Sequence, residues 1–220
     1  LRLNDDYQQF IHQRKLFMII IGITGSIGMG KSTVSKMFRA LKIPVFDSDK
    51  KVKEILDKNH QVIEQISKIW PDSIIENKKQ RKINKVILSE KIFRSKIERK
   101  KLENIIHPIV RKERKSFLYE SQGSFIVGLD VPLLYETGMD NNCDYVFLVN
   151  TTKNNQKKRV LIRSNMTEKK FEFINNSQWS FKKKAAKNPY IVSTSFGKTI
   201  TFFIVLFYLF KIIVRGKLYG

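Results

Sequence analysis

Short apolar runs alternate along the chain with longer stretches in which apolar residues recur every three or four positions. Five of these runs are apolar on both faces, which is typical of strands in a buried parallel sheet: 19–23, 43–46, 125–129, 145–149 and 190–192. Helical spacing fills the segments at about 50–122 and 153–187. The pattern therefore predicts an α/β fold in which helices flank a five-stranded parallel sheet.

The length of 220 residues suits one domain with insertions better than two independent domains. We expect this domain to cover 18–220, with an all-helical insertion at about 50–122. The stretch at about 153–187 is rich in lysine, and such an insertion commonly serves as a lid in phosphate-transfer folds. Residues 1–17 are polar and mixed in charge, so we interpret them as an upstream extension of the reading frame or a disordered leader.

A further apolar run occupies 199–214 and is interrupted by Lys211. A membrane span needs about 20 apolar residues, whereas a helix that is apolar on all sides also suits a protein core. We predict a terminal helix packed in the core, with weak membrane contact as the less favoured alternative.

Residues 25–32 form a complete G-x-x-x-x-G-K-[ST] string between the first predicted strand and a helix predicted from Lys31 to about Leu41. Glycines allow the chain to turn tightly and to direct backbone N–H groups at phosphate oxygens. In this motif Lys31 reaches the β- and γ-phosphates and the Ser32 hydroxyl suits Mg²⁺. The string, hereafter the phosphate loop, predicts nucleotide binding.

Carboxylates follow two of the predicted strands, and ligands of open α/β sheets bind at the carboxyl ends of strands. Asp47 follows the second strand and can accept a proton from an attacking hydroxyl or hold Mg²⁺ through water. We assign Asp47 to function and Asp49 to capping of the next helix. Asp130 closes the third strand as a Walker-B-like carboxylate and is a candidate metal ligand.

Two further motifs are less specific by themselves. His107-Pro108 is typical of a turn or a helix start. Arg159 and Arg163 share one helical face, so they suit either a phosphate clamp in a lid or a solvated basic surface.

Together these motifs resemble the dephospho-coenzyme A kinase family over residues 18 to about 194. The resemblance rests on an ordered set of segments: Gly-Ile-Thr-Gly-Ser-Ile-Gly-Met-Gly-Lys-Ser-Thr-Val at 22–34, Asp-Ser-Asp at 47–49, Leu102-Glu103 leading to His107-Pro108, Asp-Val-Pro-Leu-Leu-Tyr-Glu-Thr at 130–137, and Gln156 with Arg159 and Arg163. Other phosphate-loop kinases share the first segment but not the Pro-Leu-Leu-aromatic-Glu segment.

The resemblance implies transfer of a phosphoryl group from ATP to the ribose 3′-hydroxyl of dephospho-coenzyme A, the last step of coenzyme A synthesis. It also implies a helical acceptor-binding region at about 50–122 and a lid at about 153–187. Asp47 would be the base or orienting group, and Arg159 would approach the phosphates from the lid. The ATP phosphates and Mg²⁺ would be held by Gly28, Met29, Gly30, Lys31, Ser32 and Thr33, and the acceptor side would be lined by Lys85, His107, Leu133, Leu134 and Glu136.

Several positions depart from the family pattern. Lys85 stands where the family usually has Arg, which exchanges a forked donor for a point charge. Around the fifth strand the family has Ala-Asp before it and Asn after it, whereas this chain has Asn188-Pro189 and Ser193. Trp179 replaces a smaller apolar residue. The departures at Asn188-Pro189 and Ser193 concern the adenine side and leave an inactive relative as one alternative.

The formal net charge of +22 also suits partners that are anionic. Lysine supplies 31 of the 42 basic residues, and Ile, Asn and Phe are abundant as well, as in the products of A/T-rich genomes. Because no nucleic-acid motif accompanies the charge, we expect no dedicated nucleic-acid partner. The only cysteine, Cys143, allows no internal disulfide and is typical of a reducing cytoplasm.

Two other functions remain open from the residues alone. One is another small-molecule or nucleoside monophosphate kinase, which would consume ATP and ignore dephospho-coenzyme A. The other is a basic nucleic-acid-associated ATPase, whose binding should weaken steeply with salt.

Overall fold

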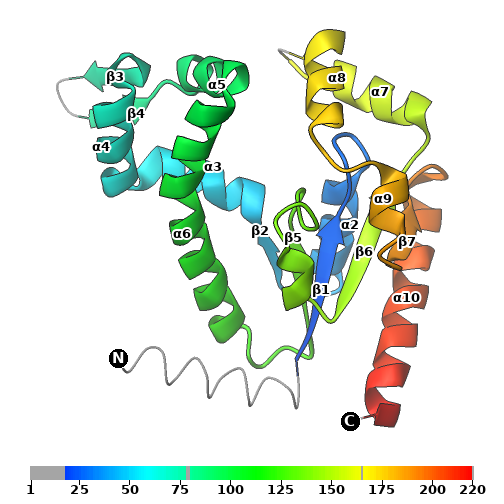
Figure 1. Ribbon diagram of the computed structural model, residues 1–220. Coiled ribbons are helices and arrows are strands. Elements are labelled where there is room, and N and C mark those ends of the chain that lie inside the picture. Colours follow the sequence, from blue (N-terminus) through cyan, green and yellow to red (C-terminus); the bar gives the residue numbers. More distant parts are fainter. Residues whose placement is uncertain (1–17, 78–79, 165, 220) are drawn as a thin grey trace. The chain divides into compact units, whose positions relative to one another are not determined.

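The computed structural model describes residues 18–77, 80–164 and 166–219 (Figure 1). The expectation for residues 1–17 therefore lies outside the described residues. The chain divides into two compact units: Leu1–Phe46 with Tyr119–Gly220, hereafter the sheet unit, and Asp47–Leu118, hereafter the insertion unit. Each unit is described by itself.

The sheet unit is built on one five-stranded sheet with the order β2-β5-β1-β6-β7. β1 pairs in parallel with β5 and β6, and β6 pairs in parallel with β7. The strands are β1 (Ile19–Thr24), β2 (Val45–Asp47), β5 (Ile126–Asp130), β6 (Tyr145–Asn150) and β7 (Tyr190–Ser193). The predicted parallel sheet is confirmed, because all five expected strands are present within two residues at each end.

The centre of the sheet is buried on both faces, as the unbroken apolar run of β1 predicts. Ile20, Ile21 and Ile23 are fully buried. Gly22 has no room for a side chain, because a Cβ there would lie 2.8 Å from Leu134 Cδ2 and 2.9 Å from Cys143 Sγ. This close approach packs the segment after β5 against the central strand.

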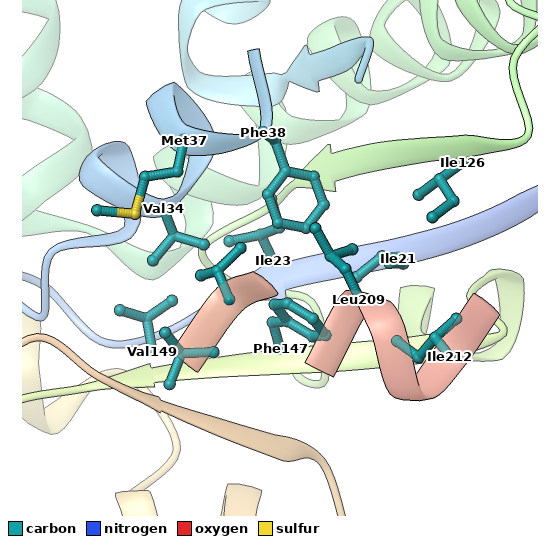
Figure 2. Packing of buried hydrophobic residues seen from close by; sticks show 12 residues of the cluster. Ile21, Ile23, Val34, Met37, Phe38, Ile126, Phe147, Val149, Leu209 and Ile212 are labelled. Carbon is teal, nitrogen blue, oxygen red and sulfur yellow. The ribbon is translucent and has the colours of Figure 1, made fainter. Parts of the chain in front are cut away.

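Two helices, α2 (Lys31–Ala40) and α10 (Gly197–Tyr219), pack on the same side of the sheet. Figure 2 shows Phe38 of α2 together with Leu209 and Ile212 of α10 around Phe147 of β6. The Phe38 and Phe147 rings meet edge to face at 5.6 Å between centroids, a favoured aromatic geometry. The apolar run at 199–214 is thus helical. The predicted packing in the core is met on one side of this helix only, because Phe203 and Phe207 on the opposite side are exposed.

The helical stretch predicted at about 153–187 consists of α7 (Lys153–Leu161), α8 (Glu168–Asn176) and α9 (Phe181–Ala185). A short 3-10 turn, η2 (Met139–Asn142), precedes β6. Each of the three helices begins at a hydroxyl side chain that accepts a backbone N–H, namely Thr152, Thr167 and Ser180. Local capping chemistry therefore sets the starts of the helices.

The insertion unit is not all-helical, and that prediction was wrong. It contains α3 (Ser48–Lys58), α4 (His60–Ile69), the 3-10 turn η1 (Pro71–Ser73), β3 (Ile74–Asn77), β4 (Gln80–Ile83), α5 (Lys85–Arg94) and α6 (Lys96–Glu120). β3 and β4 form an antiparallel hairpin that aligns Ile74 with Ile83. Both side chains pack against a cluster around Ile66 and Trp70, so tertiary burial favours strands in this short segment.

The long helix α6 passes through Pro108, which lies inside it rather than at the start of a new helix. The turn or helix start expected at His107-Pro108 is therefore not present. Trp70 links this helix to α4, because its Nε1 donates to Glu98 Oε2 at 2.6 Å.

Candidate active site

The phosphate loop connects β1 to α2, as the motif requires. Gly28 and Gly30 have φ values of 78° and 94°, which are favourable for glycine and strained for other residues. A Cβ at Gly28 would lie 2.5 Å from Val160 Cγ2 and 2.9 Å from the Gln156 carbonyl oxygen. The glycines thus permit both the turn and the close approach of α7, which Figure 1 shows beside the loop after β1.

Lys31 is held at the carboxyl end of β5. Its Nζ lies 2.7 Å from Asp130 Oδ1, and the Ser35 hydroxyl donates to the other oxygen, Oδ2, at 2.6 Å. Asp130 is only 3% exposed, so this is a charge-assisted bond in a nearly dry environment. The structure thereby brings together Lys31 and Asp130, which sequence reasoning named separately.

Arg159 reaches the same region from α7. Its Nη1 donates to Thr194 Oγ1 at 2.8 Å and its Nη2 donates to the Thr194 carbonyl at 2.9 Å. Thr194 Oγ1 in turn donates to the Met29 carbonyl at 2.8 Å. A Cβ at Gly30 would lie 3.0 Å from Arg159 Nη1, so the guanidinium lies against the phosphate loop. Arg163, exposed after the end of α7, is not brought to the loop by any of these bonds.

Thr194 was missed by sequence reasoning. Its position directly after β7 is a signal that could have identified it, because ligand-facing residues gather at the carboxyl ends of strands.

Two glutamine side chains form hydrogen bonds with the backbone of Ile27 within the phosphate loop. Gln178 Oε1 accepts from the Ile27 N–H at 2.9 Å, and Gln156 Nε2 donates to the Ile27 carbonyl at 2.8 Å. Gln156 also donates to Asn175 Oδ1 at 3.0 Å. The segment 153–187 is therefore joined to the phosphate loop at both the N–H and the carbonyl group of Ile27. Gln178 carries no spacing signal by which the sequence would reveal it.

The segment after β5 contains the predicted acceptor-side residues Leu133, Leu134 and Glu136. Leu133 is 38% exposed, whereas Leu134 is fully buried. Glu136 Oε1 lies 3.0 Å from Lys184 Nζ and accepts from the Trp179 N–H at 2.8 Å. Lys184 is completely buried, which sequence reasoning did not anticipate in a lysine-rich stretch. Glu136 thus fastens this segment to α9 through a buried ion pair.

Tyr135 lies next to this ion pair and stacks on Trp179, with 6.4 Å between ring centroids. Burial raises the pKa of the Tyr135 hydroxyl to about 12, with smaller electrostatic contributions from Asp140 and Cys143. Among the described residues, the Tyr135 hydroxyl and Glu136 Oε2 are buried without a hydrogen-bond partner. Such groups are costly to bury.

The remaining predicted residues belong to the insertion unit. Asp47 ends β2 and its side chain accepts the Lys50 N–H at 2.9 Å, so Asp47 itself is the N-cap of α3. The prediction that Asp49 caps this helix was wrong: Asp49 lies in the first helical turn, and the cap position precedes that turn. Lys85 Nζ lies 2.7 Å from the Asp57 carboxylate, and His107 is exposed on α6.

A divalent cation is implied by a phosphate loop, and the donors present suit Mg²⁺. The described residues contain no group of three or more His, Cys, Asp or Glu that could hold a metal by themselves. Mg²⁺ in phosphate sites characteristically takes one or two protein oxygens and completes its shell with water and substrate phosphates. The exposed Ser32 hydroxyl and the Asp130 carboxylate are oxygen donors of this kind.

A family model described as dephospho-CoA kinase matches residues 19–197. The dephospho-CoA kinase of Bartonella henselae is 41% identical over 179 residues, covering 80% of this chain and 89% of its own length. That of Rhodopseudomonas palustris strain HaA2 is 36% identical over 182 residues, covering 82% of this chain and 88% of its own length.

Two solved structures are also similar. A protein of Thermus thermophilus superposes with a TM-score of 0.78 at 25% identity, covering 89% of this chain and 97% of its own. The dephospho-CoA kinase from Campylobacter jejuni superposes with a TM-score of 0.64, also at 25% identity and with the same coverage of both chains.

Proposed function

The chain belongs to the dephospho-CoA kinase family, and on this premise we infer that it phosphorylates the ribose 3′-hydroxyl of dephospho-coenzyme A with ATP. The product is coenzyme A, so the reaction is the final step of coenzyme A biosynthesis. The single observation that carries the chemistry is the 2.7 Å pair between Lys31 and Asp130 beneath the glycine-rich turn. This pair supports the proposal, because phosphoryl transfer needs a cation for the phosphate charge and a carboxylate near the metal ion.

The donor half of the site is proposed on this geometry. ATP phosphates would be held by Gly28, Met29, Gly30, Lys31, Ser32 and Thr33, with backbone N–H groups and the start of α2 favouring negative charge. Lys31 exchanges its bond with Asp130 for the phosphate oxygens when ATP binds. Arg159 stabilises negative charge on the transferred phosphoryl group from the lid side, where its guanidinium already lies against Gly30.

Mg²⁺ would be held by Ser32 and Asp130 together with phosphate oxygens, and it would supply neutralisation of phosphate charge. The fit rests on the oxygen donors of the chain, because Asp130 keeps a carboxylate at the strand end and Ser32 is exposed to solvent.

The acceptor half of the site is proposed from position in the family motifs. Asp47 would accept the proton of the ribose hydroxyl or orient it. The acceptor would be lined by Lys85, His107, Leu133, Leu134 and Glu136. Of these, Glu136 acts mainly by fixing the segment after β5, since its Oε1 is occupied by Lys184 and Trp179. The single cysteine supports a reducing compartment, and we propose the cytoplasm.

Release of ADP from Mg-ATP tests the function directly. We expect dephospho-coenzyme A to accelerate ADP release strongly, and the product to comigrate with authentic coenzyme A. Nucleoside monophosphates and single-stranded DNA or RNA are the comparison substrates for the two other candidate functions. Acceleration by one of these and none by dephospho-coenzyme A would overturn the assignment.

A further inference from the structure

Helix α10 presents two apolar faces that have different surroundings. Along one face Thr201, Val205, Leu209 and Ile212 are at most 5% exposed. This face packs against α2 and β7, and Figure 2 shows Leu209 and Ile212 beside Phe147. One half of the helix is therefore part of the folded core of the sheet unit.

The other face of α10 is exposed and strongly aromatic. Its side chains recur at steps of three or four and so form one continuous stripe, hereafter the phenylalanine stripe: Ile200 (50% exposed), Phe203 (64%), Phe207 (59%), Phe210 (67%) and Val214 (38%). At 1.5 Å per residue the stripe is about 21 Å long. Monomeric soluble proteins rarely leave contiguous apolar patches of this size uncovered, and such patches mark interaction sites.

The charged residues within the sequence of α10 are all basic. The sequence of α10 contains no Asp or Glu, while Lys198, Lys211 and Arg215 are exposed on it. The sequences of α2, β6 and β7, which pack against α10, also contain no acidic residue. α2 adds the exposed Lys36 and Arg39. A surface that covers the stripe must therefore be apolar in its interior and negative at its boundary.

We propose that the phenylalanine stripe docks on an anionic lipid surface, with α10 lying in the plane of the membrane interface. Aromatic side chains of such a helix enter the boundary between headgroups and acyl chains, and lysine and arginine bind the acidic headgroups. The stripe is a ridge on a helix, which a fluid lipid surface accommodates without a matching groove.

Two other occupants fit the structure less well. By length and composition α10 could span a membrane, but one such helix is weak evidence for a membrane span. A spanning α10 would also remove Val205 and Ile212 from the hydrophobic core. Docking of a second copy of the chain would bring two identical basic surfaces together, and each chain has a net charge of +22, so the two copies would repel each other. An acidic lipid surface relieves this repulsion.

The stripe is separate from the proposed chemistry. The segment matched by the family model ends at Gly197, which is the first residue of α10. None of the residues proposed to bind ATP or the acceptor lies on α10. Docking would therefore localise the enzyme without changing its active site.

Vesicle flotation of the full chain tests the proposal. We expect the protein to float with vesicles of phosphatidylcholine mixed with phosphatidylglycerol, to float much less with phosphatidylcholine alone, and to be released by added salt. Two stripe substitutions together, F203Q/F207Q, should lower the partition coefficient at least ~10-fold, because two aromatic side chains no longer leave water. Dephospho-coenzyme A kinase activity should be unchanged in this variant.

The control variant V86Q/I97Q removes two equally exposed apolar side chains from α5 and α6, where they are 62% and 70% exposed, and should float like the unchanged protein. Equal flotation of F203Q/F207Q and the unchanged protein would overturn the proposal, because charge alone would then explain binding. It would also be overturned by an unchanged protein that ignores acidic vesicles. A lipid-free dimer that F203Q/F207Q converts to a monomer, without vesicle binding, would assign the stripe to self-association instead.

Discussion

Arg159 donates two hydrogen bonds to Thr194, one to the hydroxyl at 2.8 Å and one to the backbone carbonyl at 2.9 Å. The same hydroxyl donates to the carbonyl of Met29 in the phosphate loop at 2.8 Å. One side chain at the end of β7 thus connects the arginine of α7 to the loop.

Thr194→Ala should reduce turnover by about ten- to a hundred-fold. A hydrogen bond to a charged group is worth about 1.5–3 kcal/mol, and its loss leaves Arg159 less well oriented toward phosphate. Steady-state kinetics with Mg-ATP and dephospho-coenzyme A measures the effect. Thr194→Ser keeps the hydroxyl and is the matched control, expected within a few-fold of the unchanged enzyme. Similar losses in both variants would show that the methyl group matters and the hydroxyl does not.

Asp47→Asn should cut turnover at least ~100-fold while ATP still binds, because the amide cannot accept the proton of the acceptor hydroxyl. Asparagine caps helices as well as aspartate does, so the contact with the Lys50 N–H and the start of α3 should survive. Turnover and calorimetric ATP binding are measured on the same samples. Asp49→Asn, in the first turn of the same helix, serves as control. Near-normal turnover of Asp47→Asn would remove this residue from the mechanism.

Lys31→Ala should weaken ATP binding and turnover together, each by roughly a hundred-fold or more. The variant lacks the ammonium group that stabilises the negative charge developing on the phosphate. Lys36→Ala, an exposed lysine later in α2, is the control and should leave both quantities unchanged. Thermal unfolding of both variants separates this effect from loss of the Asp130 ion pair. An unaffected Lys31→Ala enzyme would contradict the assignment of the phosphate loop.

Glu136→Ala should lower the free energy of unfolding by about 3–5 kcal/mol, because it leaves the fully buried ammonium of Lys184 without its counter-ion. Urea denaturation measures the change. The double variant Glu136→Leu with Lys184→Met removes both charges and should regain most of the stability, since apolar pairs replace buried ion pairs at little cost. A single substitution that costs less than about 1 kcal/mol would show that the pair is well solvated.

Tyr135→Phe should leave the free energy of unfolding at neutral pH unchanged or slightly higher, because the hydroxyl is buried without a partner among the described residues. Burial raises the pKa of Tyr135 to about 12 in the folded state, above the ordinary value of about 10. The folded state therefore binds this proton more tightly. The resulting stabilisation is complete below about pH 10 and is lost as the pH rises through about 12.

Between neutral pH and about pH 11 the Tyr135→Phe variant should consequently lose less stability than the unchanged protein. Tyr119→Phe, which removes an exposed hydroxyl, is the matched control. An identical alkaline dependence in Tyr135→Phe and the unchanged protein would argue that the hydroxyl is accessible to water.

Features that depend on a short stretch of the sequence were predicted correctly. The five strands follow from apolar runs, and the phosphate loop follows from eight consecutive residues whose chemistry is nearly unique. The hairpin β3–β4 was missed because its four-residue strands lie among helical spacings and gain their preference from packing against Ile66 and Trp70. Asp49 was chosen as the cap of α3 from residue type alone, and only the backbone shows that the helix begins one residue after Asp47.

By itself the sequence determined the parallel sheet, the phosphate loop and the family, because each depends on neighbours within a few positions or on an ordered set of motifs. The tertiary structure alone decided which distant groups meet. Gln178 binds Ile27 across 151 positions, Thr194 binds Met29 across 165, and Lys184 is buried against Glu136 despite its lysine-rich surroundings. In α10 apolar residues occur on every side, so only packing on the sheet selects the buried face and leaves the phenylalanine stripe in solvent. The physical reason is that burial depends on the arrangement of separate elements, which no local pattern encodes.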